Sequence, residues 1–369
     1  MFNMVAHFDE KVEYAIQNIW IDTHSDKKID ALAKLREAAN MGDGDAFYFL
    51  GRCYLGKSFV DPSVGMPDDP TFAFECFDMS LSLESAVGMF GTMHLEGYTP
   101  SCGSFIQPPY HSKKEIWDVV KKMADNGQIF CQFLIANAYY YCDAADFLGI
   151  TPENVGGRQA YIKLVHEWAA EAIRLYENCV SKGLGIAIPN MVDVLTSGKH
   201  DIPIQKESAK KYWNIGAEMG IGAYERIVGN EYRDEGQLSK AVSMYERALA
   251  HGDNYAYYCL GKLYTYNGAL KLDLKKALDF LEKGHAAQPE DSGFCNLLGE
   301  IYFRGGQGIE TDFDKAFYFL NKAYHNGSTW GTDMLGICYA KGLGTTPDTT
   351  MAKKLLSLHP HKRNKSGMP

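Results

Sequence analysis

A glycine-centred motif recurs along the chain, and this recurrence restricts the fold more than any other feature of the sequence. Six copies place an apolar residue directly before the glycine, and they are centred on Gly51, Gly91, Gly229, Gly261, Gly299 and Gly336. Two degenerate copies carry Ala136 and Val192 in the same position. Successive copies lie 40, 45, 56, 37, 32, 38 and 37 residues apart, a spacing typical of one structural unit in a repeat protein. The chain is therefore predicted to consist of stacked repeats.

Each copy predicts a pair of helices. Apolar residues around the glycine follow the helical period. A tyrosine stands three positions after the central residue in six copies, as Tyr54, Tyr139, Tyr232, Tyr264, Tyr302 and Tyr339. A second periodic segment follows, for example SKAVSMYERALAHG and DKAFYFLNKAYHNG. Asp312 and Asp348 precede two of these segments and are predicted N-caps. With a further pair at residues 7–20 and 27–42, we predict an all-α chain of about nine helical hairpins and no strands.

The position of the glycine inside a helix needs an explanation, because glycine in a helix interior costs about 1 kcal/mol relative to alanine. Over six copies the cost reaches about 6 kcal/mol. We expect tight packing to offset it, because a missing side chain lets a neighbouring helix approach closely. The alternative, a flexible hinge at each glycine, is disfavoured because the flanking leucine and tyrosine keep the helical register.

Composition limits the class of protein. Lys and Arg number 37 against 46 Asp and Glu, and the formal net charge of −9 argues against a broad surface for nucleic acid or anionic membrane. The sequence has no recognisable secretory signal and no run of 18 apolar residues. Nine cysteines, none in a CxxC pair, are interpreted as buried reduced thiols. These features predict a cytoplasmic protein, although export without a cleavable signal stays open.

Taken together, the repeated residues resemble the Sel-one-like repeat family, which is related to the tetratricopeptide repeats. Residues 291–344 follow the family pattern through Leu298, Gly299, Tyr302, Gly306, Gly308, Asp312, Lys315, Ala316, Ala323 and Gly327. The resemblance extends over about residues 27–358. It implies a right-handed α-α superhelix, or solenoid, whose members act as adaptors and scaffolds for protein complexes. The family also has a disulfide-rich secreted branch, whose cysteine pairing this chain lacks.

The domain prediction is a single solenoid over residues 1–358, followed by a flexible tail at 359–369. Its better-matching repeats lie at 27–97 and 206–358.

Two irregular insertions, 97–112 and 142–159, interrupt the repeats. Insertions in solenoids map to loops on one face, which are often functional, although tolerated surface loops fit equally well.

No catalytic, metal or cofactor site is predicted. HEWAAE at 166–171 begins like a zinc-protease motif but has Ala170 where the second histidine would stand. The glycine-rich stretches GGQGIE and GLGTT lack the Lys-Ser/Thr of a phosphate loop and follow no predicted strand. We therefore predict that the protein is not an enzyme.

The predicted site lies on the first helix of each hairpin, on the face opposite the one that carries the repeat glycine. In tetratricopeptide-like solenoids, first helices line the concave groove, and positions −6, −3, +1 and +4 from the glycine form one stripe there. Exposed aromatic, Arg and Asn side chains suit peptide recognition. The predicted partner-binding residues are Arg226, Asn230, Arg233, Tyr255, Tyr258, Lys262, Asn296, Glu300 and Trp330.

Earlier repeats contribute equivalent positions, which are Asp45, Tyr48, Arg52, Phe130, Phe133, Asn137 and Tyr140. Arg226, Asn230, Arg233 and Lys262 partly resemble the carboxylate clamp of co-chaperone tetratricopeptide domains. Alternatively, some of the aromatic residues pack between neighbouring first helices.

The functional prediction is a protein–protein interaction scaffold that binds a protein or a peptide and no nucleic acid. A partner with acidic groups is one option. Two alternatives are kept. One is a secreted bacterial effector of the same repeat class that acts on host proteins. The other is an enzyme whose site is built from the insertions 97–112 and 142–159.

Overall fold

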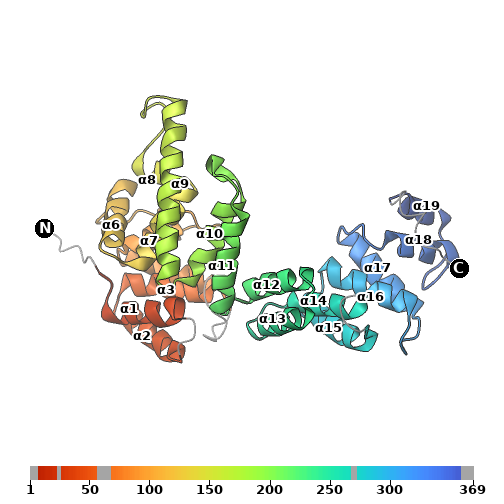
Figure 1. Ribbon diagram of the computed structural model, residues 1–369. Coiled ribbons are helices and arrows are strands. Elements are labelled where there is room, and N and C mark those ends of the chain that lie inside the picture. The colour runs from red at the N-terminus through yellow and green to blue at the C-terminus, as the bar shows by residue number, and fades with distance from the viewer. Residues whose placement is uncertain (1–6, 23–25, 56–67, 267–271, 359–369) are drawn as a thin grey trace. The chain divides into compact units, whose positions relative to one another are not determined.

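The computed structural model describes residues 7–22, 26–55, 68–266 and 272–358. Within these ranges the chain is helical, and its only strand-like feature is an isolated bridge between Gly306 and Ile309. The chain divides into two compact units, Met1–Met219 and Gly220–Pro369, which are described separately below (Figure 1). The single solenoid over 1–358 stays a prediction. The predicted tail at 359–369 lies outside the described residues.

The first unit contains five pairs of helices and one inserted helix. In chain order its α-helices are α1 (Glu10–Ile16), α2 (Lys28–Asn40), α3 (Gly44–Tyr54), α4 (Pro70–Ser82), α5 (Ala86–Thr92), α6 (Lys113–Asp125), α7 (Ile129–Tyr140), α8 (Asp143–Leu148), α9 (Arg158–Ser181), α10 (Ile188–Thr196) and α11 (Lys206–Glu218). A π-helical turn, η1 (Gln17–Ile21), extends α1, and two 3-10 turns, η3 (Gly185–Ala187) and η4 (Lys199–Asp201), flank α10. The inserted helix α8 lies between α7 and α9, which pack on each other.

The second unit contains four pairs of helices. They are α12 (Gly222–Asp234) with α13 (Leu238–Ala250), α14 (Ala256–Thr265) with α15 (Leu274–Ala287), α16 (Ser292–Arg304) with α17 (Phe313–His325), and α18 (Thr332–Lys341) with α19 (Thr349–Ser357). Each second helix also packs on the first helix of the following pair, so the hairpins stack in chain order (Figure 1). Within the described ranges the two units contain nine hairpins, in agreement with the predicted number of about nine, and the all-α prediction is confirmed.

The repeat glycines lie at close contacts, as predicted. A Cβ atom placed on Gly299 of α16 would lie 2.7 Å from Cγ of Leu320 on α17, and one on Gly261 would lie 2.6 Å from Leu281 on α15. The glycine thus admits a large side chain from the second helix of its own hairpin. Gly91 differs, because its added Cβ would collide with the hydroxyl of Tyr48 on α3, an earlier first helix.

The second helices begin at the predicted aspartates. The carboxylate of Asp312 accepts a hydrogen bond of 3.0 Å from the backbone N–H of Lys315. Asp348 accepts two bonds of 2.9 Å from backbone N–H groups at the start of α19. Both predicted N-caps are therefore confirmed, and each satisfies helix N–H groups that have no partner within the helix.

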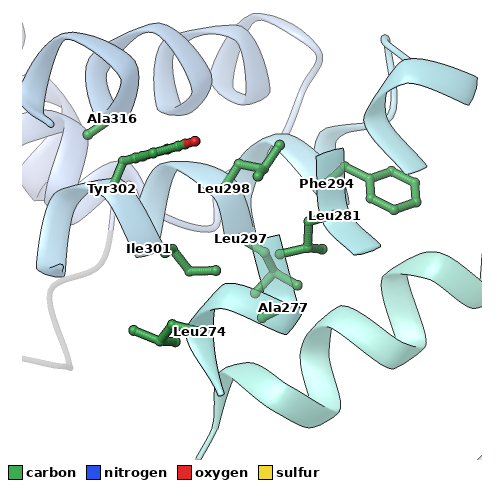
Figure 2. Close-up of a cluster of buried hydrophobic side chains, with 9 residues drawn as sticks. All are labelled: Leu274, Ala277, Leu281, Phe294, Leu297, Leu298, Ile301, Tyr302 and Ala316. Carbon is green, nitrogen blue, oxygen red and sulfur yellow. The ribbon is translucent and has the colours of Figure 1, made fainter. Parts of the chain in front are cut away.

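Successive hairpins share one hydrophobic core. Figure 2 shows a cluster of buried side chains from α15, α16 and α17 in the second unit. Its members are Leu274, Ala277, Leu281, Phe294, Leu297, Leu298, Ile301, Tyr302 and Ala316. Because α15 belongs to one hairpin and α16 and α17 to the next, neither hairpin buries this surface alone.

The two insertions fold onto the first unit. In the first, Tyr98 is buried, and its hydroxyl donates a 2.8 Å hydrogen bond to Asp78 of α4. The second forms α8, whose Phe147 stacks on Phe90 of α5 with 4.2 Å between ring centroids. Both insertions thus add packed side chains to the unit.

Candidate functional site

The nine predicted partner-binding residues all belong to the second unit. Arg226, Asn230 and Arg233 lie on α12, Lys262 and Tyr258 lie on α14, and Tyr255 is the N-cap residue of α14. Asn296 and Glu300 lie on α16, and Trp330 precedes α18. We call the surface formed by Arg226, Tyr255, Tyr258 and Lys262 the tyrosine face.

Two tyrosines connect neighbouring first helices across the tyrosine face. The ring centroids of Tyr255 and Tyr258 lie 5.1 Å apart, and both rings contact Phe294 of α16 at 6.2 and 5.8 Å. Phe294 is fully buried, whereas both tyrosines are half-buried. Each tyrosine therefore packs between helices with one part of its ring and leaves another part at the surface. The sequence left open whether these aromatic residues pack between first helices or are exposed for binding. Tyr255 and Tyr258 do both in part.

Two cations lie over these rings. The guanidinium carbon of Arg226 is 5.2 Å from the ring centroid of Tyr255, and Nζ of the exposed Lys262 is 5.8 Å from that of Tyr258. A cation over an aromatic face is attracted by about 0.5–1 kcal/mol at an exposed site. The tyrosine face therefore combines apolar ring area with positive charge.

The two arginines of α12 are held by acidic neighbours. Nε of Arg226 lies 2.7 Å from Oδ2 of Asp253, which precedes α14. Arg233 pairs with Asp234 at 2.8 Å, and its Nη1 donates to Oδ1 of Asn230 at 3.2 Å. These contacts fix both guanidinium groups. They also mean that Lys262 is a more accessible cation than either arginine.

The charges converge on Cys259 of α14. Burial raises the pKa of the Cys259 thiol to about 11, while Arg226, Arg233 and Lys262 act in the opposite direction. Its Sγ lies 3.8 Å from Oδ1 of Asn230, which also accepts a 2.9 Å hydrogen bond from Tyr245. The structure therefore brings the four residues of the partial carboxylate clamp around one buried thiol.

The remaining predicted residues have different roles. Asn296 is 6% exposed, and its Nδ2 donates to Ser328 at 2.8 Å. Glu300 is 8% exposed and accepts hydrogen bonds from the Tyr266 hydroxyl at 2.7 Å and from Arg304 at 2.9 Å. Both side chains are thus engaged inside the unit. Trp330, at 41% exposed, is the accessible aromatic residue of this group.

Sequence reasoning missed two residues of the tyrosine face. Asp253 orients Arg226 and also accepts a 3.0 Å hydrogen bond from the backbone N–H of Tyr255. Phe294 forms the floor on which both tyrosines rest. The position of Asp253, two residues before Tyr255, was a sequence signal by which it could have been found. Phe294 lies outside the stripe positions, so the sequence contained no signal for it.

Several stripe positions in the first unit are core residues instead. Tyr48, Phe130 and Tyr140 are at most 1% exposed, so the expectation that they line an open face is wrong. Tyr48 and Phe130 pack in one aromatic cluster with Phe49, whose ring lies 4.7 Å from that of Phe130. Neighbouring helices of the first unit cover these side chains, which is why they are buried.

The cysteines form no disulfide, since all nine are free thiols, and seven of them are buried. Burial raises the pKa of Cys53, Cys76 and Cys179 to about 12, which keeps these groups protonated and weakly nucleophilic at neutral pH. Among the described residues, no group of three or more His, Cys, Asp or Glu side chains is placed to hold a metal ion. No described helix combines the length and apolarity needed to cross a bilayer.

The fold and this face define an α-helical repeat protein, and comparison with known proteins identifies the repeat. Residues 254–284, 294–328 and 333–358 match the family model of the Sel1 repeat. These ranges correspond to the hairpins α14–α15, α16–α17 and α18–α19. These three segments match the Sel1 repeat, and the predicted resemblance to the Sel-one-like repeat family is confirmed.

The chain is also similar to solved structures. One is a protective antigen present in uropathogenic Escherichia coli strains that displays an SLR fold. It is 20% identical over 89% of this chain, with a TM-score of 0.52, and this chain spans 64% of its length. A Sel1 repeat protein from Oxalobacter formigenes is 25% identical, covers 67% of this chain and 93% of its own, and has a TM-score of 0.47. No curated protein matches the chain. The first likeness supports the solenoid fold alone.

Proposed function

We propose that the second unit binds a protein or peptide partner on the tyrosine face and thereby acts as a scaffold or adaptor. The observation that carries the proposal is the pair of half-buried tyrosines, Tyr255 and Tyr258, each with a cation over its ring. Sel1 repeats form a fold of protein-interaction scaffolds, which supports the same reading of the face.

The chemistry of the face favours a polypeptide with an acidic group. Tyrosine provides large contact area with little loss of conformational entropy, and it is enriched among the residues that dominate binding energy. Lys262 is exposed beside Tyr258 and attracts a carboxylate at the rim of such a contact. Arg226 and Arg233 add to the positive potential there, although both already pair with aspartates.

Lys262→Glu is the substitution that tests the proposal with little risk to the fold. Arg226→Glu would place a carboxylate against Asp253, whose side chain is 12% exposed, and would destabilise the unit. Lys262 is exposed, and no ion pair joins it to a described acidic side chain. The matched control is Lys240→Glu. Lys240 lies on the second helix α13, is also exposed, and its Nζ is 5.3 Å from the ring centroid of Tyr232 on α12.

The experiment captures partners of the full chain from its native cells and then measures the affinity of a purified partner for each variant. We expect Lys262→Glu to weaken binding on the order of fivefold, as rim charges do, while Lys240→Glu binds as the unmodified chain. Circular dichroism checks that both variants keep their helical content. Equal binding by both variants would exclude the tyrosine face.

We further propose a reducing location, the cytoplasm, for this scaffold. The nine unpaired thiols support it, since secreted repeat proteins rely on disulfides more often than cytosolic ones. An effector delivered into a host cytoplasm would meet the same conditions, so this alternative is kept. The enzyme alternative, with a site in the insertions 97–112 and 142–159, also stays a prediction.

A further inference from the structure

A cavity of about 360 Å³ lies in the first unit, apart from the tyrosine face. It is bounded by α3, α5, α7, the inserted helix α8 and the segment η3–α10. Volumes of this order are typical of sites for small ligands or for one or two residues of a peptide. The cavity therefore has room for a compact ligand.

The walls of the cavity are largely aromatic. Phe90, Phe133 and Phe147 line it, and the parallel stacking of Phe90 on Phe147 fixes one wall. Gly91 also lines the cavity, and any side chain there would collide with the Tyr48 hydroxyl. The repeat glycine of this copy thus keeps both Tyr48 and the cavity in place. An apolar group of the ligand would lie against these rings.

One half-buried cation belongs to the wall. The guanidinium of Arg52 lies 5.0 Å from the ring centroid of Phe130 and 5.8 Å from that of Tyr48. Its Nη1 donates a 3.2 Å hydrogen bond to the Tyr48 hydroxyl. Because the rings and this bond restrain it, Arg52 offers a fixed positive charge at the cavity. Guanidinium groups recognise carboxylates through their planar set of N–H donors.

The amide side chain of Asn137 lines the same cavity. Oδ1 of Asn137 accepts hydrogen bonds from the Tyr176 hydroxyl at 2.8 Å and from Nδ2 of Asn190 at 2.7 Å, and both asparagines line the cavity. These two bonds fix the orientation of the Asn137 side chain. Its Nδ2 group donates to no described residue, so the donor is available to a ligand oxygen.

The acidic groups at the rim lie next to basic side chains. His94 lies 3.7 Å from Asp143 and also 3.7 Å from Asp146, and Lys113 lies 2.6 Å from Asp146. Of these residues, His94 and Asp143 line the cavity itself. The carboxylates of the rim thus have basic neighbours within the unit, and Arg52 and Asn137 line the same cavity.

We propose that this cavity binds a carboxylate attached to an apolar group, such as the C-terminal residue of a polypeptide or a small carboxylic acid. Arg52 and the Nδ2 group of Asn137 bind the carboxylate oxygens, and the phenylalanine rings contact the apolar part. The site is independent of the tyrosine face, because the two lie in different compact units.

The test uses the full chain and two sets of probes in a calorimetric titration. One set contains hexapeptides with apolar C-terminal residues, each made with a free carboxylate and with a C-terminal amide. The other contains N-acetylphenylalanine and its amide. We expect the acid to bind at least about tenfold more tightly than the matching amide, because a hydrogen-bonded ionic contact is worth about 1.5–3 kcal/mol. Tighter binding of the hexapeptide acids identifies a polypeptide end as the source, and tightest binding of N-acetylphenylalanine identifies a small acid.

Asn137→Asp is the informative variant, because it keeps the acceptor for Tyr176 and Asn190 but replaces the donor with a carboxylate. We expect it to lose at least about tenfold in affinity for the acid probes through like-charge repulsion. The matched control is Asn214→Asp on α11, because Asn214 is an exposed asparagine of the same compact unit that does not line the cavity. Absence of saturable binding, equal affinity for acid and amide, or equal loss in both variants would overturn the proposal. Where Asn137→Asp does not fold, the acid–amide comparison is repeated on Lys262→Glu, which weakens the tyrosine face. An unchanged preference for the acid then assigns the binding to the cavity, and loss of the preference overturns the proposal.

Discussion

Gly299→Ala tests the packing argument most directly. The added methyl would lie 2.7 Å from Cγ and 2.9 Å from Cδ2 of Leu320, and 3.2 Å from the backbone nitrogen of the same residue. Leu320 is 2% exposed and packs in a core cluster with Leu335 and Leu355, so it has little space to move away. The close contact with the backbone nitrogen of Leu320 cannot be relieved by a change of side-chain rotamer. The substitution therefore forces a shift of α17 relative to α16.

The expected change in stability is the sum of two opposing effects. Alanine improves helix propensity by about 1 kcal/mol, whereas overpacking a filled core costs about 1–3 kcal/mol. We expect Gly299→Ala to lower the free energy of unfolding by up to about 2 kcal/mol, the difference between the two effects. In a unit of this size such a loss lowers the midpoint of thermal unfolding by up to about 8 °C.

A double-mutant cycle with Leu320→Ala isolates the contact. Leu320→Ala alone costs about 2–5 kcal/mol, because it leaves a cavity. In that background the methyl at position 299 has space, so Gly299→Ala becomes neutral or stabilises by up to about 1 kcal/mol. Denaturation followed by circular dichroism measures all four proteins. The reasoning is refuted if Gly299→Ala stabilises the unmodified chain, or if it costs the same in both backgrounds.

Three further outcomes are expected. Gly336→Ala should cost less than about 1 kcal/mol in the same assay, because the side chain that it meets, Leu356, is only half-buried and can move. Asp312→Ala should remove the N-cap of α17 and lower stability by about 1 kcal/mol, with Asp312→Asn as a nearly neutral control. Burial raises the pKa of Asp45 from 3.8 to about 6, so its ionisation destabilises the folded state as pH rises through 6. Asp45→Asn, which retains an acceptor for Ser85, should stabilise the chain by roughly 1–3 kcal/mol at pH 7 and by almost nothing below pH 4, and equal gains at both pH values would contradict this.

The sequence predicted the hairpins well because their determinants are local and repeated. Gly299 marks the contact with the partner helix, and Asp312 marks where that helix begins. Both signals recur at the same places in successive copies, so each copy supports the interpretation of the others.

Exposure along the stripe was harder to predict, because it depends on segments outside the repeat pattern. Tyr140 occupies a stripe position, yet it is buried, and its hydroxyl donates to Asp193 of α10 at 2.8 Å. Glu300 is covered in a similar way by Tyr266, which follows the end of α14. The periodicity of one helix fixes which residues share a face, but the loops and neighbouring helices decide whether that face meets solvent.

The cavity of the first unit could not be predicted from the repeats for the same reason. Phe147, one of its walls, comes from the insertion 142–159, and the orientation of Asn137 depends on Tyr176 and Asn190 from two other helices. The sequence placed Arg52 and Asn137 on the predicted stripe and identified the insertion 142–159. It did not indicate that these residues line one cavity.

The core shared between successive hairpins has a consequence for how the second unit opens. The hairpin α18–α19 packs on α17, and no further hairpin follows it in the described part of the chain. Losing it forfeits one interface, whereas losing α14–α15 would forfeit two, so amide hydrogens should exchange soonest at that extremity. Limited proteolysis would then remove α18–α19 first and leave a folded product in which Phe294 and the tyrosine face are intact.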